Sequence, residues 1–356
     1  MAGTVAFVGV AKNTGKTTTL NRLVEATVRI GSRLGLVSVG IDGEASDALS
    51  GADKPSIYLP AGHWVASAGG ALDRSTARFE YVDMLGFETP MGRACIARVI
   101  DAGEVCLAGM RHRRDLQAAR RALFARGVDR VFVDGAYGRM AAADGRLADA
   151  VVLSTGAVLE ASIGGIVEQT RRFAGRLGVP PVEGEADRRM MERSIADGRV
   201  LIRRGDEIVD PEIESALVEL GDRAELLDEG VGAVAIPGVV SSGVVRMLIN
   251  APADEGVLLV PAPSSIQVDS EMWAALADSP WRIQALHAVE LAAISANPVA
   301  VQGWRVDSGE LVDALRKAWP EYAVFDPITA DDAVTTPLKS YFDRSNRSCL
   351  ATVVGR

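Results

Sequence analysis

The stretch VAFVGVAKNTGKTTTLNRL, residues 5–23, combines an apolar run, a turn containing Gly15 and a helical pattern. The apolar run predicts a buried strand ending at Gly9, and the apolar spacing that follows predicts a helix from Thr17 to Ile30. A loop between a strand and a helix presents successive backbone N–H groups, and the helix adds the positive end of its dipole. The stretch therefore predicts a phosphate-binding loop.

Seven residues of this loop are expected to contact a nucleotide: Lys12, Asn13, Thr14, Gly15, Lys16, Thr17 and Thr18. We expect Lys16 to reach the β- and γ-phosphates and to act in catalysis, and the Thr17 hydroxyl to ligate Mg²⁺. Lys12 is expected to reach either a phosphate bound to its own subunit or one bound to the other subunit of a homodimer. The alternative is an ordinary helix start that contains Gly-Lys-Thr by chance.

The first glycine of the loop is displaced from the common pattern G-x-x-x-x-G-K-[ST]. That pattern requires glycine at position 10, where the chain has Val10, and the nearest glycine is Gly9. The resulting spacing, G-x5-G-K-T, resembles the loop of dethiobiotin synthetase and its relatives among the P-loop proteins. That group includes ATP-dependent amide-forming enzymes, partitioning ATPases and metallochaperone GTPases.

Two acidic positions follow later strands. In RVFVDGAYGR (residues 130–139), Asp134 ends an apolar run, in a pattern similar to the E-G-A-G-G element of dethiobiotin synthetase. At the end of a strand beside the loop, Asp134 is expected to hold Mg²⁺ through water. In VSVGIDGEASD (residues 37–47), Asp42 is expected to position water or to complete the magnesium shell. An Asp-Gly turn and a solvated acidic loop are the alternatives for these two sites.

The base preference follows from the five lysines, because none lies in an [NT]-K-x-D element of the kind that reads guanine. We therefore expect ATP rather than GTP. Thr155 and Gly156, which follow another apolar run, are expected on the adenine side of the site.

Strand and helix patterns alternate along the first half of the chain, which predicts a mainly parallel, doubly wound α/β sheet. The paired prolines and charges of residues 179–189 suggest a break. We accordingly expect a P-loop nucleotide-binding domain at residues 1–178. A second α/β domain, suited to partner interaction, is expected at residues 179–356 and would include the apolar run ending at Asn297.

Composition excludes several other classes of protein. The net charge of −9 argues against nucleic acid as the main partner. Three scattered cysteines are too few for a disulfide framework or a zinc site. No basic leader and no apolar run of membrane-spanning length is present, so we expect a cytoplasmic protein without a membrane partner.

A narrower resemblance combines several runs: GVAKNTGKTTTLN, GIDGEASD, WVASAGGAL, VDGAYGR and STGAVLEASI. In this order they resemble the P-loop reactivase subunit of adenosylcobalamin-dependent lysine 5,6-aminomutase. The resemblance implies that ATP drives release of a damaged cobalamin from the mutase. It also implies two partners, the aminomutase itself and a second reactivase subunit.

Two other functions stay open from the sequence. One is an ATP-dependent ligase or kinase that activates a small carboxylate, which would need a basic residue beside the γ-phosphate to hold that carboxylate. The other is a GTPase that delivers a metal. The missing [NT]-K-x-D element and the missing Cys/His cluster count against the second.

Overall fold

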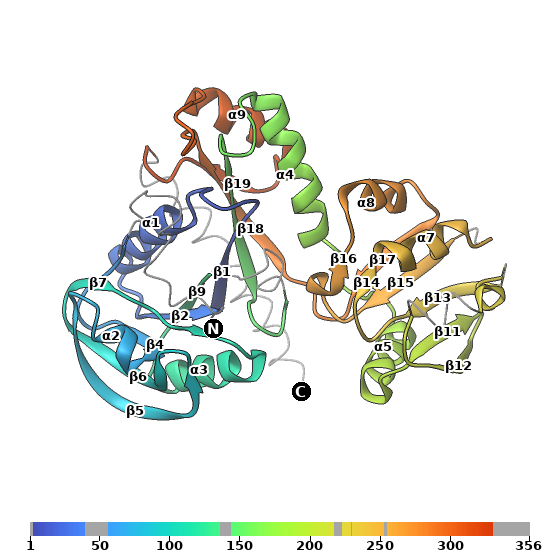
Figure 1. The fold of residues 1–356 in the computed structure, drawn as a ribbon, viewed down its shortest axis with the longest axis horizontal. Coiled ribbons are helices and arrows are strands. Elements are labelled where there is room, and N and C mark those ends of the chain that lie inside the picture. The colour runs from blue at the N-terminus through green and yellow to red at the C-terminus, as the bar shows by residue number, and fades with distance from the viewer. Residues whose placement is uncertain are drawn as a thin grey trace, which may run out of the picture. The chain divides into compact units, whose positions relative to one another are not determined.

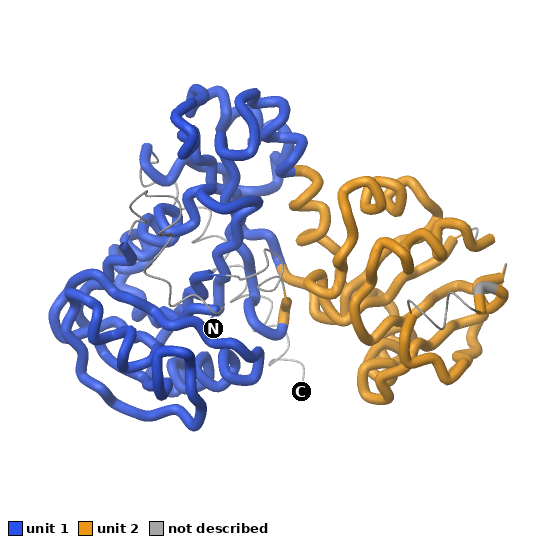
Figure 2. Tube along the Cα trace, viewed as in Figure 1, with its two compact units in different colours: residues 1–142, 146–170, 290–356 blue, residues 143–145, 171–289 orange. Residues whose placement is uncertain are grey.

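The computed structural model of the chain describes residues 3–39, 56–135, 144–216, 223–228, 230–252 and 255–329 (Figure 1). The chain divides into two compact units (Figure 2). Unit 1 consists of residues 1–142, 146–170 and 290–356, and unit 2 of residues 143–145 and 171–289. The division falls inside the helix α4 (Ile163–Leu177).

Unit 1 is built on a ten-stranded sheet with the order β19-β18-β10-β1-β9-β2-β4-β6-β5, in which β8 also pairs with β2. Its strands are β1 (Gly3–Gly9), β2 (Leu34–Val39), β4 (Trp64–Ala68), β5 (Arg78–Thr89), β6 (Gly92–Asp101), β8 (Gly109–Met110), β9 (Arg130–Asp134), β10 (Ala150–Gly156), β18 (Glu290–Asn297) and β19 (Ala323–Phe325). The unit also contains a two-stranded sheet, β3 (Ile57–Leu59) with β7 (Gly103–Val105), and the helices α1 (Lys16–Arg29), α2 (Gly69–Leu72), α3 (Arg113–Ala125) and α9 (Ser308–Ala318).

Most strand pairs of this sheet are parallel, as the alternating pattern predicts. The exceptions lie at one edge, where β4 pairs with β6 and β6 pairs with β5 in antiparallel fashion. The strand β1 lies in the interior, between β9 and β10. Because the carboxyl ends of parallel strands meet at one edge of a sheet, the residues after β1, β9 and β10 are brought together there.

Helices cover both faces of the sheet, and β2 shows this directly. Leu34 and Leu36 pack in the same apolar cluster as Leu20 and Leu23 of α1. Gly35, between them, faces the other way, and a Cβ on it would lie 3.1 Å from a methyl group of Leu123 in α3. Successive residues of a strand point to opposite faces, so α1 and α3 lie on opposite sides of the sheet. Unit 1 is therefore doubly wound, as expected.

The core below α1 centres on Phe7 and Phe132, from the neighbouring strands β1 and β9. Their rings meet edge to face with centroids 5.2 Å apart. Both side chains are almost fully buried. This packing fixes the strand from which the candidate loop departs.

The predicted domain division, 1–178 and 179–356, is wrong for the C-terminal part of the chain. The strand β18 pairs in parallel with β10, from Ala150↔Glu290 to Gly156↔Asn297, and β19 pairs with β18. In Figure 1 the orange β18 accordingly runs beside the green β10. Pairing between strands that are distant in sequence leaves no local signal. An apolar run therefore predicts a strand but does not indicate to which of the two sheets the strand belongs.

Unit 2 contains a second, five-stranded sheet with the order β12-β11-β13-β15-β17. Its elements are α5 (Glu185–Asp197), β11 (Val200–Arg204), β12 (Glu207–Ile213), η1 (Ala224–Leu226), β13 (Val231–Ala235), β14 (Val240–Ser241), α7 (Ser242–Asn250), β15 (Gly256–Val260), η2 (Pro263–Ser265), β16 (Ile266–Gln267), α8 (Ser270–Ala277) and β17 (Trp281–Ala285). The pairs β13–β15 and β15–β17 are parallel, whereas β11 pairs antiparallel with both of its neighbours. This mixed α/β architecture matches the α/β class expected for the second half.

Each face of this second sheet has its own apolar cluster. Met190 and Met191 of α5 pack on one face with Leu259 of β15. Val244 of α7 and Leu276 of α8 pack on the other face, with Leu258 of β15 in the same cluster. Helices of unit 2 therefore pack on both faces of the sheet.

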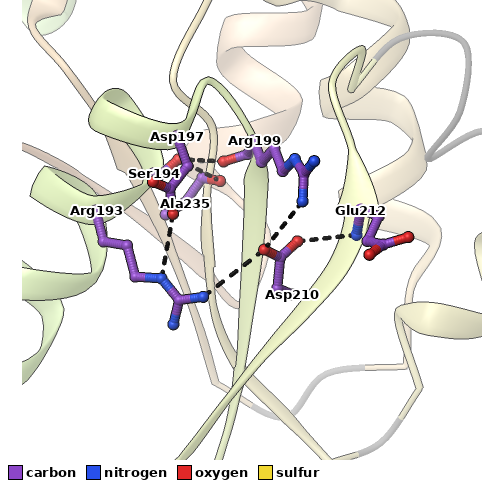
Figure 3. A network of polar contacts seen from close by, with 7 residues as sticks. All are labelled: Arg193, Ser194, Asp197, Arg199, Asp210, Glu212 and Ala235. Atoms are coloured by element: carbon purple, nitrogen blue, oxygen red, sulfur yellow. Dashed lines mark hydrogen bonds and ion pairs between the residues drawn. The ribbon is translucent and has the colours of Figure 1, made fainter.

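A polar network ties α5, and Arg199 just before β11, to the strand β12 (Figure 3). The carboxylate of Asp210 lies 3.7 Å from a guanidinium nitrogen of Arg193 and 3.7 Å from one of Arg199. Its Oδ1 also accepts a hydrogen bond of 2.9 Å from the backbone N–H of Glu212. Glu212 has a φ of 61°, in the left-handed region, and lies where the pairing of β12 with β11 is irregular, so the hydrogen bond from its N–H to Asp210 stabilises this irregular backbone.

Among the described residues, no helix is both long enough and apolar enough to cross a bilayer.

Candidate functional site

The loop between β1 and α1 has a backbone that suits an anion. Asn13 and Gly15 both have positive φ, 62° and 85° respectively. Residues in left-handed conformation within a turn rotate successive N–H groups toward a common centre, which forms an anion-binding concavity. The predicted turn between a strand and a helix is therefore present, with the helix starting at Lys16, one residue before the predicted Thr17.

Gly9 explains the displaced glycine of the sequence pattern. A Cβ at this position would lie 2.4 Å from Thr14 Oγ1 and 2.8 Å from the carbonyl oxygen of Ala11. The same Cβ would lie 3.1 Å from Cδ of Lys16. The loop and the lysine stem fold back against the end of β1, and the contact at 2.4 Å leaves no room there for a side chain. The glycine is needed at position 9 because the loop closes on it.

The N-terminus of α1 keeps its positive character. Its N-cap residue is Gly15, without a side-chain cap, and its first turn contains no acidic residue. The first N–H groups of a helix have no partner within the helix and carry the positive end of the dipole. Thr17 is buried and Thr18 half-buried in this turn, with half-buried Lys16 at its start. This end of the helix therefore favours a negatively charged group.

Three buried hydroxyls anchor the first turn of α1 to the sheet. Thr19 Oγ1 lies 2.7 Å from Ser295 Oγ, and Ser295 Oγ donates to Ser154 Oγ at 2.9 Å. Thr19 Oγ1 also donates to the carbonyl of Gly15 at 2.9 Å. Ser154 and Ser295 are in register on β10 and β18. This hydroxyl cluster, made of Thr19, Ser154 and Ser295, fixes the helix start to two strands.

Asn297, at the end of β18, reaches the loop itself. Its Nδ2 donates a hydrogen bond of 3.3 Å to the carbonyl oxygen of Asn13. Its Cβ would be 3.3 Å from a Cβ on Gly15. Its Oδ1 accepts from the N–H of Val299 at 3.1 Å, which orients the amide. Asn297 therefore holds the loop at both of its left-handed positions, although sequence reasoning assigned it no chemistry and placed it in the other domain.

Asp134 ends β9, the strand directly beside β1. On its other side Asp134 is in register with Ser38 of β2. Gly135 follows with φ of 70°, and a Cβ there would lie 3.0 Å from the carbonyl oxygen of Val39. The chain therefore turns sharply after a half-buried carboxylate at the edge where the loop lies. This is the position predicted from the sequence.

The remaining residues that the sequence assigned to the site differ from one another in exposure and in their contacts. Lys12 and Asn13 are exposed, and Thr14 is buried with its hydroxyl donating to the carbonyl of Ala11 at 3.1 Å. Asp42 lies outside the described residues. The expected adenine contact of Thr155 is not supported, because its fully buried hydroxyl is hydrogen-bonded to that of Thr170 on α4.

The residues of the loop fit a phosphate chain. The positive φ values, the glycine cradle and the uncapped helix end are all features that an anion requires. A hydroxyl at Thr17 and a carboxylate at Asp134 are oxygen ligands of the type that Mg²⁺ prefers. Among the described residues, no group of three or more His, Cys, Asp or Glu side chains is placed to hold a metal ion without a nucleotide.

Comparison with known proteins adds little to this geometry. No family model matches the chain, and no curated protein matches it by sequence. Among solved structures, the structure of pnob8 ParA matches with 14% identity and a TM-score of 0.27. That match covers 51% of this chain and 65% of the other chain, so this chain spans less than two thirds of that structure.

Proposed function

We propose that this chain binds a nucleoside triphosphate at the loop between β1 and α1 and hydrolyses it with Mg²⁺. The observation that carries the proposal is the closure of the loop on Gly9, with left-handed Asn13 and Gly15 and an uncapped helix end. A turn of this geometry between a parallel strand and a helix supplies backbone donors to phosphate oxygens.

The side chains of the loop have distinct proposed roles. Lys16, whose stem lies against the end of β1, neutralises charge on the β- and γ-phosphates. The Thr17 hydroxyl and the Asp134 carboxylate are proposed to hold Mg²⁺, directly and through water respectively. The ion supplies charge stabilisation to the transferred phosphoryl group. Asp42 remains proposed as a residue that orients water.

ATP is the proposed nucleotide. The five lysines of the chain include none in an [NT]-K-x-D element. The seven proposed contacts are those of the loop, residues 12–18, and the hydroxyl cluster and Asn297 hold this loop and the first turn of α1 in place. A competition between ATP and GTP for the same site tests this preference, and tighter binding of GTP would contradict it.

The metal role of Asp134 has a direct test. We expect Asp134→Asn to bind ATP without Mg²⁺ as the wild type does and to lose most of the gain in affinity that Mg²⁺ brings. The matched control is Asp101→Asn, an exposed carboxylate paired with Arg78 on the surface. Calorimetric titration with and without Mg²⁺ measures both quantities. Equal weakening in both conditions would argue against the metal role.

The finer proposal concerns the use of ATP. We infer that hydrolysis serves to reactivate a cobalamin-dependent lysine aminomutase together with a second reactivase subunit. Support comes from the sequence runs that resemble the reactivase subunit and extend across most of the chain. In this scheme the ATP and ADP states differ in affinity for the partner and so bias its conformation.

The test of this finer proposal is ATP hydrolysis with and without a lysine aminomutase inactivated by turnover. Stimulated hydrolysis with recovered mutase activity is the expected result. Hydrolysis that is indifferent to the mutase would contradict the client while leaving the nucleotide site intact. It would favour a different client or a ligase that activates a small carboxylate.

A further inference from the structure

Unit 2 contains a cavity of about 510 Å³, which lies within the range of roughly 300–1,000 Å³ typical of ligand sites. It is lined by residues of β17, by Val257 of β15, by the start of α5, by α8 and by the end of α4 with the segment that follows it. All of these residues belong to unit 2. None of them takes part in the nucleotide site, and the proposed function leaves the cavity without a role.

The cavity borders the outer edge of β17 and also extends over the sheet as far as Val257 of β15. Four consecutive residues of this strand line it: Trp281, Arg282, Ile283 and Gln284. Alternate residues of a strand point to opposite faces, so a cavity that all four reach must border the edge. The strand β17 is also the last strand of its sheet.

The backbone orientation of β17 is fixed by its neighbours. The N–H of Ala285 donates to the carbonyl of Pro180 at 2.9 Å, and the carbonyl of Ala285 accepts from Val182 at 3.2 Å. Leu286, by contrast, donates inward to Val260 of β15. Ala285 therefore presents its backbone groups outward, and so does Ile283, two residues earlier on the strand. The segment around Pro180 pairs with this edge at Ala285, and Ile283 lines the cavity.

Two tryptophans form one side of the cavity. Trp273 of α8 stands against Gly175, where a Cβ would lie 3.2 Å from its Nε1. Trp281 lies over Gly256 of the next strand, where a Cβ would lie 2.5 Å from its ring. Trp281 is buried, and its Nε1 has no hydrogen-bond partner among the described residues. Because Gly175 and Gly256 have no side chains, the rings of the two tryptophans fit beside the edge of β17.

The charged side chains that line the cavity differ in whether they form ion pairs. Asp187 is paired with Arg203 at 2.8 Å, and Arg282 with Glu255 at 3.1 Å. Glu183, which also lines the cavity, forms no ion pair with any described residue. Its backbone N–H donates to Oε1 of buried Gln284, which fixes this segment beside the strand. The cavity thus carries one unbalanced carboxylate.

We propose that this cavity binds an extended peptide segment of a partner protein, which pairs with β17 as a sixth strand. The outward N–H and C=O of Ile283 supply main-chain hydrogen bonds, and the segment continues the pairing begun by Pro180 and Val182. An aliphatic or aromatic side chain packs against Trp273, and a lysine or arginine side chain pairs with Glu183. The proposal is independent of nucleotide binding.

The experiment uses the full chain and a phage-displayed library of random peptides, followed by fluorescence anisotropy with the selected peptides. Ala277→Arg places a long side chain in the cavity from an exposed position, without removing a packed group. Ala274→Arg is the matched control, because Ala274 is exposed on the same helix and does not line the cavity. We expect Ala277→Arg to weaken binding by at least about tenfold and Ala274→Arg to leave it unchanged.

Two further measurements distinguish strand addition from side-chain binding alone. Methylation of single backbone nitrogens in a selected peptide should abolish binding at alternate positions, because only every second N–H faces β17. Glu183→Gln should weaken peptides that contain lysine or arginine, and Glu185→Gln, outside the cavity, should not. Failure to select peptides, equal binding to both arginine variants, or tolerance of methylation at every position would overturn the proposal.

Discussion

Nδ2 of Asn297 donates a hydrogen bond of 3.3 Å to the carbonyl oxygen of Asn13, although 284 residues separate the two in sequence. The contact joins the last residue of β18 to the left-handed turn of the candidate phosphate loop. The C-terminal part of the chain is thereby a structural component of the candidate phosphate loop. The conformation of this loop depends on a strand that the sequence places far from it.

Asn297→Ala should weaken ATP binding without unfolding the protein. The substitution removes one hydrogen bond to the loop, which is worth about 1 kcal/mol, or roughly fivefold in affinity. The measurement is calorimetric titration with ATP and Mg²⁺. Gln302→Ala is a control, because Gln302 is exposed in the loop that follows β18. Unchanged affinity in Asn297→Ala would show that the loop holds its shape without this contact.

Gly9→Ala should disrupt the loop. The added Cβ would meet Thr14 Oγ1 at 2.4 Å and a backbone oxygen at 2.8 Å, so the loop must shift. Forced displacements of this kind cost about 1–3 kcal/mol. Gly164→Ala is the control, because a Cβ there meets nothing within 4 Å. ATP affinity should fall in the first variant and stay constant in the second, and normal binding by Gly9→Ala would contradict the closed loop.

His63 should make the stability of the protein depend on pH. Its Nδ1 accepts a hydrogen bond of 3.0 Å from the N–H of Leu34, and burial lowers its pKa below the usual value of 6.5. The unfolded chain therefore takes up the proton first as the pH falls. Stability due to neutral His63 is present above pH 6.5, declines as the pH falls through the interval down to the folded pKa, and levels off below it.

Thermal unfolding of His63→Gln over this pH interval checks that prediction. The variant should lose part of the pH dependence shown by the wild type, whereas His112→Gln, on the surface, should retain it. Identical pH profiles for wild type and His63→Gln would assign the pH dependence to other groups.

Glu212→Gly should cost less stability than the same change in an ordinary strand position. Glu212 has a φ of 61°, where a non-glycine residue is strained by about 1–2 kcal/mol. Relief of this strain offsets the chain entropy of glycine, about 0.5–1 kcal/mol. Glu207→Gly, in the same strand β12, has no such compensation. Denaturant unfolding compares the two, and a larger loss for Glu212→Gly would contradict the strain argument.

The local parts of the fold were predictable from the sequence because they follow hydrophobic periodicity. The strand expected to end at Gly9 is β1, and the expected helix 17–30 corresponds to α1, Lys16–Arg29. The helix α5 was missed because Pro180 and Pro181 and the charges after them suggested a break. The loop was predictable because a strand, a glycine turn and a helix follow one another within a few residues.

The long-range parts were not predictable. Parallel pairing of β18 with β10 depends on contacts between segments far apart, and each strand alone is an apolar run. Ser295 and Asn297 therefore had no recognisable signal beyond the Asn-Pro step that ends β18. Asp134 was predictable because it directly follows an apolar run, whereas Asp42 lies outside the described residues.

The most direct test of the central claim is ATP binding by Lys16→Ala in the presence of Mg²⁺. Lysine donates charged hydrogen bonds worth about 1.5–3 kcal/mol each, so affinity should fall by at least about tenfold and hydrolysis should cease. Lys317→Ala, an exposed lysine of α9, should bind and hydrolyse ATP as the wild type does. Wild-type affinity and turnover in Lys16→Ala would contradict the assignment of the loop as a nucleotide site.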